Sequence, residues 1–556
     1  MRPAVWAPHP DVVELVLSDA VHPMEDRPLG WWQARIDVPA GAGYRFRLDG
    51  TDLPDPRSRW QPEGVHGPSR AVDPAAFVWH DDTWRTPDLA DAVLYELHVG
   101  TFSAEGTFEG VIGRLDHVLD LGATAIELMP VAEFAGDRGW GYDGVDLFAP
   151  HHAYGGPEGL QRLVDACHAR GLAVVLDTVY NHLGPEGNYL APFGPYFSDR
   201  HRTAWGPAVN FDGPGSPGVR DFVAENAIAW LRDYHLDGLR LDAVHAIFDD
   251  SPQHVLAELR ERVARDVGPD RWLIAETDRL DARLTGPYGL HAQWCDDVHH
   301  ALHALLTGER AGYYADFGSA DVLARALRTG HVRAPYSDDP EPVDGRRFVT
   351  YVQNHDQVGN RARGDRLTDV VPAGRARIAA ALVLLGPFVP LVFMGEEWAA
   401  STPFPFFSSH TDPDVARATT AGRVSDFAHF GWPAEDVPDP QDPATFALAR
   451  LRWDEREIGT HAAMLDWYRS LLRLRRAHAE LGAGPLASVE CEAGDGRLEV
   501  HRGPFTIVCA WGPGGRRRPL DGDLVLASSP DVRVAGGEVV LPPDSVAVVR
   551  RACAEP

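Results

Sequence analysis

Residues 219–242 read VRDFVAENAIAWLRDYHLDGLRLD and join the pattern of a helix directly to that of a strand. Val219–Tyr234 carries apolar residues three and four apart, as on one face of a helix, whereas Gly238–Leu241 is a short apolar run that fits a buried strand. The same alternation recurs through the middle of the chain and indicates parallel βα units. We therefore predict an α/β fold whose core is a (β/α)8 barrel.

Eight short apolar runs are the predicted barrel strands, with amphipathic helices between several of them. The strands are Val93–Val99, Ala123–Met129, Ala173–Val179, Gly238–Leu241, Trp272–Ala275, Gln293–Cys295, Phe348–Gln353 and Val389–Met394. The helices, besides Val219–Tyr234, are Glu158–Arg170, His254–Val267 and Gly374–Leu385. Long connections follow the third and eighth strands, over about residues 183–217 and 395–461, and connections of that length are usually functional.

Strand patterns without helices flank this region on both sides. Val12–Leu17, Trp31–Val38 and Tyr44–Gly50 are separated by turn residues and predict a small N-terminal β-sandwich, and similar runs after Pro485 predict an all-β C-terminal domain. The N-terminal sandwich either binds the substrate or braces the barrel, and we expect bracing. The predicted domains are residues 1–88, 89–484 and 485–556.

The composition excludes several classes of function. Asp and Glu number 81 against 52 Lys and Arg, and the resulting formal charge of −29 repels nucleic acids and anionic membrane surfaces. The chain contains no lysine, which removes Schiff-base chemistry and a phosphate-binding P-loop. The apolar run Ile378–Met394 is broken by Gly386 and Pro387 and is shorter than the ~20 residues of a membrane span.

The cysteines indicate a reducing compartment. They are scattered, odd in number and free of C-x-x-C pairs, so neither a disulfide framework nor a zinc motif is expected. The N-terminus also lacks the apolar core of a signal peptide, and we predict a cytoplasmic protein. The five cysteines are Cys167, Cys295, Cys491, Cys509 and Cys553.

Polar residues end four of the predicted strands. Asp177 ends the third, Asp242 and Glu276 end the fourth and fifth, and Asp356 follows the seventh. Active sites of this barrel lie where the strands end, so we expect Asp242, Glu276 and Asp356 to converge in one cleft. Carboxyl groups held close together have pKa values pushed apart, which leaves one protonated beside one ionised. Cleavage of a glycosidic bond uses that pairing.

Two other interpretations stay open at this point. Asp177 and Asn181, taken alone, fit strand closure or helix capping as well as catalysis. His182 and His355 with the nearby carboxylates fit a zinc or manganese site, but the chain has no H-E-x-x-H motif or similar close pair, so a metal is the weaker interpretation. We therefore predict no metal and no cofactor.

Four motifs resemble the sequence regions that mark the α-amylase superfamily of retaining α-glycoside hydrolases. They are DTVYNH from Asp177, GLRLDAVH from Gly238, IAETD from Ile274 and QNHDQ from Gln353. They occur in the superfamily's order, and the resemblance covers roughly residues 91–478. It implies a glycosidase that works by double displacement.

The resemblance also implies roles for individual residues. Asp242 matches the nucleophile, Glu276 the general acid/base, and Asp356 the carboxylate that grips the sugar hydroxyls. Arg240 matches the residue that orients the nucleophile, and Tyr142 an aromatic ring that stacks on the reacting sugar. The other substrate-binding residues that it implies are Asp177, His182, His355 and Gln357.

Further motifs resemble two close relatives in that superfamily, the glycogen branching enzymes and the maltooligosyltrehalose trehalohydrolases. They are LYELHVGTF from Leu94, MPVAEF from Met129 and PHHAYGG from Pro150. QNHDQVGN, where branching enzymes usually have Glu after the Asp, and FMGEEW from Phe393 favour the trehalohydrolases. That resemblance implies hydrolysis of the α-1,4 bond between a maltooligosaccharide and a terminal trehalose, and a functional link to a maltooligosyltrehalose synthase.

Three alternatives remain: glucan transfer by a branching enzyme, hydrolysis of another α-1,4-glucan, and a non-catalytic glycan-binding barrel. The last usually lacks a catalytic carboxylate, and here all three positions are filled. No acidic cluster follows His182, so a calcium ion on Asn181 is not expected.

The connection after the eighth strand is rich in aromatic residues, whose faces match the C–H surface of a sugar. We predict that they form the leaving-group side of the site; the alternative is that they pack as ordinary core. His245, three residues after Asp242, is predicted on the same side, with a helix cap as its alternative. The aromatic residues are Trp398, Phe404, Phe406 and Phe407.

Overall fold

The computed structural model describes residues 1–336, 344–429 and 432–552. Eight parallel strands close into a barrel, which confirms the predicted fold class. β16 and β17 match their predicted bounds, and the others differ by one or two residues at an end. The strands are β9 (Leu94–Leu97), β10 (Ala125–Leu128), β13 (Ala173–Thr178), β16 (Gly238–Leu241), β17 (Trp272–Ala275), β18 (Ala292–Trp294), β19 (Phe348–Tyr351) and β20 (Val389–Phe393).

Helices surround the barrel, and apolar side chains fill the space between the two layers. The apolar run at residues 378–394 divides into the end of α12 and the whole of β20, so it lies in the core. In the described part of the chain, no helix has the length and hydrophobicity to cross a bilayer. The main helices are α4 (Gly156–His168), α5 (Ser216–Asp233), α6 (Val255–Asp266), α8 (Asp296–Thr307), α9 (Ala320–Thr329), α12 (Ala373–Leu384) and α15 (Gly459–Ala477).

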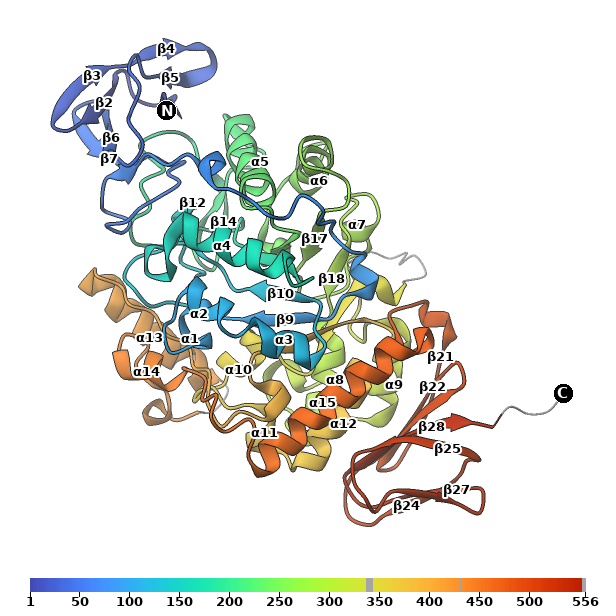
Figure 1. Cartoon of the computed structure of the whole chain (residues 1–556). Coiled ribbons are helices and arrows are strands. Elements are labelled where there is room, and N and C mark those ends of the chain that lie inside the picture. The colour runs from blue at the N-terminus through green and yellow to red at the C-terminus, as the bar shows by residue number, and fades with distance from the viewer. Residues whose placement is uncertain (337–343, 430–431, 553–556) are drawn as a thin grey trace.

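Antiparallel sheets lie at opposite ends of the barrel (Figure 1), in agreement with the all-β flanks predicted from the sequence. The boundaries at residues 88 and 484 stay predictions. On the C-terminal side, β21 packs against α9 and β28 against α12. The N-terminal strands are β1 (Ala4–Trp6), β2 (Val13–Leu17), β3 (Ala20–Pro23), β4 (Glu25–Arg27), β5 (Trp31–Gln33), β6 (Gly43–Leu48), β7 (Thr51–Leu53) and β8 (Ser69–Arg70). The C-terminal strands are β21 (Val489–Gly494), β22 (Arg497–Arg502), β23 (Phe505–Ala510), β24 (Arg516–Pro519), β25 (Gly522–Ala527), β26 (Arg533–Ala535), β27 (Glu538–Leu541) and β28 (Ser545–Arg551).

The N-terminal sheets pack on the connection that follows β13. Trp6 meets Tyr196 edge to face, with ring centroids 5.4 Å apart, and Arg57 pairs with Asp221 of α5 at 3.0 Å. That connection contains a hairpin, β14 (Phe197–Thr203) and β15 (Gly206–Val209), which the prediction of one long loop did not include. Gly206 has φ +126°, a backbone conformation that favours glycine, at the turn of this hairpin.

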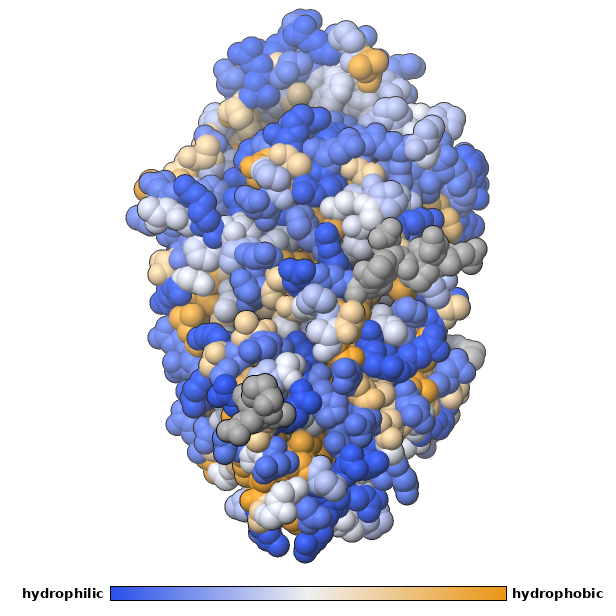
Figure 2. Space-filling view, turned by 90° about the vertical axis from the view of Figure 1, so that its right-hand side faces the viewer, coloured by the Kyte–Doolittle hydropathy of each residue, from blue (hydrophilic) through white to orange (hydrophobic). Residues whose placement is uncertain are grey.

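The connection after β20 is partly helical. It contains α13 (Pro413–His429) and α14 (Pro443–Leu448), so its aromatic residues lie within a folded layer. The face in Figure 2 is mostly hydrophilic, with hydrophobic residues in small groups, as the acidic composition suggests.

Candidate active site

Neighbouring strands bring the predicted catalytic residues to one end of the barrel. Asp177 in β13 lies opposite Arg240 in β16, and β16 and β17 end in register at Leu241 and Ala275. The next residue after each of those two strands is Asp242 and Glu276 respectively. Parallel pairing therefore places both carboxyl groups at the same edge of the barrel.

Arg240 is the centre of this arrangement. Its Nη1 donates hydrogen bonds of 2.8 Å to both carboxylate oxygens of Asp177 and to Oδ1 of Asp242. Its Nη2 lies 3.6 Å from Oε2 of Glu276 and has no hydrogen-bond partner. The guanidinium is fully buried and stacks over the Trp294 ring at 4.2 Å. A single fixed cation thus contacts three carboxyl groups.

Asp242 is held from two sides. Arg240 bonds Oδ1, and the side-chain amide of Asn181 donates to Oδ2 at 2.7 Å and to the Asp242 carbonyl at 2.9 Å. The residue is 9% exposed. These bonds fix the carboxylate where a substrate entering the barrel mouth would meet it, which suits a nucleophile.

Glu276 is held in its protonated form. Burial is the largest cause and raises the pKa of Glu276, and the charges of Asp242 and Asp356 raise it further. The Arg240 cation lowers it, and the resulting pKa is about 8. The backbone N–H of Ala243 lies 2.5 Å from Oε2. A carboxyl group that keeps its proton at neutral pH can donate it to a leaving group.

The Tyr142 hydroxyl joins the two sides of the site. It donates to Oδ2 of Asp177 at 2.6 Å and lies 2.7 Å from Nε2 of His355. His355 stacks against the Tyr142 ring and bonds Glu96 through Nδ1 at 2.5 Å. Burial lowers the pKa of His355, but the charges of Glu96 and Asp356 outweigh it and raise that pKa to about 9. Gly141 has φ +102°, and a Cβ there would lie 2.1 Å from the Pro130 carbonyl oxygen.

Asp356 lies in the first turn of α10 (His355–Gly359), with Oδ1 3.6 Å from Nε2 of His355. Its side chain is 40% exposed, more than those of Asp242 and Glu276. Gln357 is occupied by the protein: Oε1 accepts the Asn354 backbone N–H at 2.9 Å, which completes the cap of α10. The side-chain amide of Asn360 donates to Oδ1 of Asp356 at 3.2 Å, and the carboxylate is otherwise the most exposed of the three.

His182 is also occupied by the protein. Nδ1 lies 2.6 Å from Oδ1 of Asn181, and Nε2 lies 3.0 Å from the Tyr142 carbonyl oxygen. Its ring stacks at 4.4 Å on Trp205, which is 53% exposed at the tip of the β14–β15 hairpin. Trp205 therefore presents a free aromatic surface beside the predicted site.

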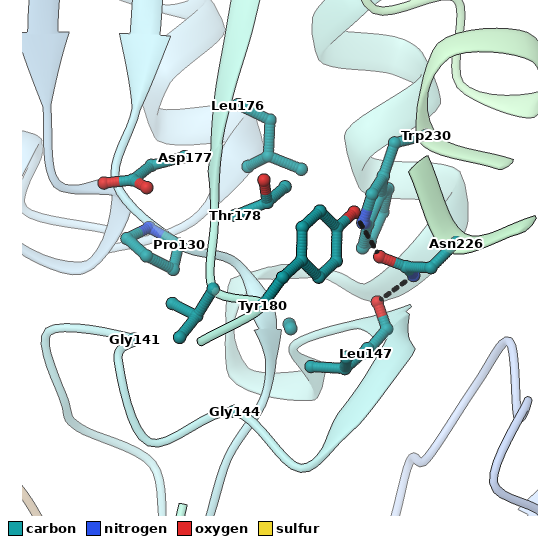
Figure 3. Close-up of a pocket in the computed structure, with 12 residues that line it drawn as sticks. Pro130, Gly141, Gly144, Leu147, Leu176, Asp177, Thr178, Tyr180, Asn226 and Trp230 are labelled. Carbon is teal, nitrogen blue, oxygen red and sulfur yellow. Dashed lines mark hydrogen bonds between the residues drawn. The ribbon is translucent and has the colours of Figure 1, made fainter. Parts of the chain in front are cut away.

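The polar residues at the end of β13 and just after it have two different environments (Figure 3). Asp177 points to one side of the strand, whereas Tyr180 points to the other and hydrogen bonds Asn226 of α5 at 2.7 Å. Both residues line a cavity of about 10 Å³, which is too small for a sugar. Of the two, Asp177 is the one that contacts Arg240.

The role predicted for His245 on the leaving-group side stays a prediction. The residue is exposed and lines a cavity of about 240 Å³ together with Thr277, the residue after Glu276, and with Arg283 and Tyr336. Apart from Tyr336, the residues that line this cavity come from the segments that follow β16 and β17 in the chain.

The structure corrects the prediction for Trp398 and Phe404. Both are fully buried, and Phe407 is buried with them. Trp398 packs against His117 and Trp453, and Phe404 stacks on Trp140 with ring centroids 5.2 Å apart. Phe407 contacts Phe446 of α14 with ring centroids 5.1 Å apart. These rings form core because burying an aromatic ring is favourable, and the fully buried ones offer no surface to a sugar.

The structure adds site residues that the sequence did not single out. Glu96 holds His355, Trp294 lies under Arg240, and Asp296 accepts hydrogen bonds from Tyr351 and Gln357. Trp205, which stacks on His182, is the fourth of these added residues. A charged residue inside an apolar strand such as LYEL, which contains Glu96, is itself a signal of function, because burying a charge is costly.

The groups of side chains that could hold a metal ion lie elsewhere in the sequence. In the described ranges, two groups of His and carboxylate side chains lie close enough to share an ion, and neither includes a predicted catalytic residue. Those groups are Glu133, His151, His152 and His201, Asp212, Asp250.

The barrel and its paired carboxyl groups define a glycoside hydrolase, and the alpha amylase catalytic domain family matches residues 74–195. A malto-oligosyltrehalose trehalohydrolase from Arthrobacter ramosus is 48% identical over 98% of this chain and 99% of its own length. A crystal structure from Salmonella typhimurium, of a protein assigned as an alpha amylase, has a TM-score of 0.90 and 38% identity over 99% of this chain and 97% of that one. A 1,4-alpha-glucan branching enzyme from Pseudoalteromonas atlantica is 32% identical over only 44% of this chain and 38% of its own. The chain belongs to the malto-oligosyltrehalose trehalohydrolase family.

Proposed function

We propose that this protein hydrolyses the α-1,4 bond between a maltooligosaccharide and a terminal trehalose, and so releases trehalose. The observation that carries the proposal is the single guanidinium of Arg240 that contacts both Asp242 and Glu276. Membership of the trehalohydrolase family supplies the substrate class.

The reaction is a double displacement. Glu276 donates its proton to the glycosidic oxygen while the Asp242 carboxylate attacks the anomeric carbon, and trehalose leaves. The glycosyl group is then bound to Asp242 as an ester. Glu276, now ionised, takes a proton from water, the hydroxide oxygen attacks the same carbon, and the Asp242 carboxylate is released.

Tyr142, Asp356 and His355 form the side that binds the reacting sugar. The Tyr142 ring faces this side with its hydroxyl already fixed by Asp177 and His355, so it loses little freedom when a sugar stacks on it. We place the departing trehalose in the cavity lined by His245, because Thr277, the residue after the proton donor, also lines it.

Hydrolysis and glucan transfer are distinguished by their products. The purified protein is incubated separately with maltooligosyltrehalose and with amylose, and the products are analysed by chromatography. Free trehalose from the first supports this proposal; new α-1,6 branches in the second, without trehalose release, would establish the branching reaction instead. Asp242→Ala should abolish either activity while the melting temperature stays close to that of the parent.

The chemistry of the substrate requires an enzyme that makes the terminal trehalose linkage at the end of a maltooligosaccharide, and we propose a maltooligosyltrehalose synthase as that supplier. We also propose a cytoplasmic location. Four cysteines lie in the described part of the chain and all four are free, as expected in a reducing compartment; Cys553 lies outside the described residues.

A further inference from the structure

Two histidines and a glutamate meet at the base of the loop that carries Tyr142. Glu133 ends β11 (Ala132–Glu133), and His151 and His152 follow β12 (Asp146–Pro150), the strand that pairs with it. One ligand atom from each of these three side chains lies within 4.8 Å of the other two. None of the three belongs to the proposed catalytic machinery.

Both imidazoles approach the same carboxylate oxygen. Oε1 of Glu133 lies 2.7 Å from Nδ1 of His152 and 3.2 Å from Nδ1 of His151, and Oε2 accepts the His152 backbone N–H at 2.8 Å. Glu133 and His151 are fully buried. Two Nδ1 atoms therefore converge on one buried oxygen.

His151 is unsatisfied in this position. Its ring stacks on Phe134 at 3.8 Å, and neither of its nitrogens has a hydrogen-bond partner, although Nδ1 faces Glu133. A neutral imidazole always carries one lone pair and one N–H, so a buried ring without partners costs free energy. A cation bound at Nδ1 would take up the lone pair.

A second buried carboxyl group lies next to this group of three. Asp146, opposite Glu133 in the β11–β12 pair, is 4% exposed, and its Oδ2 has no partner.

We propose that Glu133, His151 and His152 bind a divalent transition metal ion, zinc by the chemistry of the ligands. Two imidazole nitrogens and one carboxylate oxygen are a common zinc set, with bonds of about 2.0–2.2 Å and water in the fourth position. His152 is 21% exposed in its side chain and provides the route of entry. The Glu133–His152 hydrogen bond would be exchanged for two metal bonds.

Such an ion would clamp the ends of one loop. Residues 134–145 leave β11 and return to β12, and they carry Tyr142 to the proposed active site. Zinc bound by residues on both strands would close this loop at its base. Metal binding at these three residues is independent of whether the protein cleaves glycosidic bonds.

The test is zinc binding by the full chain after removal of metals with a chelator. Equilibrium dialysis against micromolar zinc, followed by metal analysis, should give one tightly bound ion per chain. Cobalt in its place should give the strong visible bands of a tetrahedral site. Hydrogen exchange in residues 134–145 should slow when zinc is added.

Glu133→Gln and His152→Gln should each weaken zinc binding at least tenfold. His201→Gln is the matched control, since it alters the other His–carboxylate group and should leave the affinity unchanged. Circular dichroism and the melting temperature without metal establish that each variant is folded. The proposal is overturned if the parent chain retains no zinc, if cobalt gives no tetrahedral bands, or if folded Glu133→Gln and His152→Gln bind as tightly as the parent.

Discussion

The protonated state of Glu276 gives the sharpest prediction. Its pKa of about 8 means that roughly nine-tenths of the molecules carry the proton at pH 7 and one-tenth at pH 9. If the proton is transferred in the first chemical step, kcat/KM should fall about tenfold between pH 7 and pH 9 and about tenfold again by pH 10. This alkaline limb of the pH profile is tested by measuring trehalose release from maltooligosyltrehalose at low substrate concentration between pH 7 and pH 10.

Glu276→Gln removes the proton but keeps the size of the side chain. The rate with maltooligosyltrehalose should fall roughly 10²–10⁴-fold, the range for loss of a general acid, and the alkaline limb near pH 8 should disappear. An α-maltooligosyl fluoride is the control substrate, because fluoride leaves without being protonated. The variant should release fluoride from it in a burst close to the parent's.

The opposite results would refute this reasoning. A parent enzyme as active at pH 9 as at pH 7 would show that Glu276 does not act as the acid with this pKa. Equal losses of Glu276→Gln on the sugar and fluoride substrates would show that the residue contributes through structure and not through its proton. A folded, fully active variant would remove Glu276 from the mechanism.

Three further substitutions test the network around the site. Arg240→Met leaves the buried carboxyl groups of Asp177 and Asp242 without their cation, so urea unfolding should show a loss of about 3–5 kcal/mol; an unchanged midpoint would contradict the electrostatic role of Arg240. Tyr142→Phe keeps the ring but loses hydrogen bonds of 2.6 and 2.7 Å to charged partners, so kcat/KM should fall about 10–100-fold; a change below twofold would leave the hydroxyl without a role. Glu127→Met removes a buried carboxyl group in which neither oxygen has a partner, and the variant should be about 1–3 kcal/mol more stable at pH 7. Burial raises the pKa of Glu127 well above its usual value, so the folded state binds the proton more tightly than the unfolded state and the parent loses stability as the pH rises. The stability gain of Glu127→Met should therefore grow with pH, and a constant gain would contradict this linkage.

The barrel and the positions of the carboxyl groups follow from local sequence patterns. Each strand is a short apolar run, and a polar residue directly after a parallel strand has to lie at the C-terminal edge of the barrel, so Asp242 and Glu276 meet whatever the helices do. The four motifs then identify the chemistry. Strand ends were less accurate: the seventh strand was predicted to end at Gln353, but β19 ends at Tyr351 and Asn354 caps α10. A polar residue such as Gln353 fits a strand end or the approach to a helix equally well.

The sequence could not separate the aromatic residues that face the cleft from those that are buried. Phe404 and Trp205 are both aromatic residues in long connections, yet one is fully buried and the other is 53% exposed. Their difference depends on how α13, α14 and the β14–β15 hairpin fold back onto the barrel, which is set by contacts between distant segments. Local spacing carries no information on such contacts.

The division of labour between Asp242 and Glu276 follows from how Arg240 shares its hydrogen bonds. Its Nη1 bonds Asp177 and Asp242 at 2.8 Å, whereas Glu276 is limited to a contact of 3.6 Å with Nη2. One cation that is already occupied by two carboxylates cannot also hold a third ionised group in the same buried space. Glu276 is the group left with its proton, and Asp242 the group fixed for attack. Arg240 of β16 therefore determines, before any substrate binds, that Glu276 is the acid and Asp242 the nucleophile.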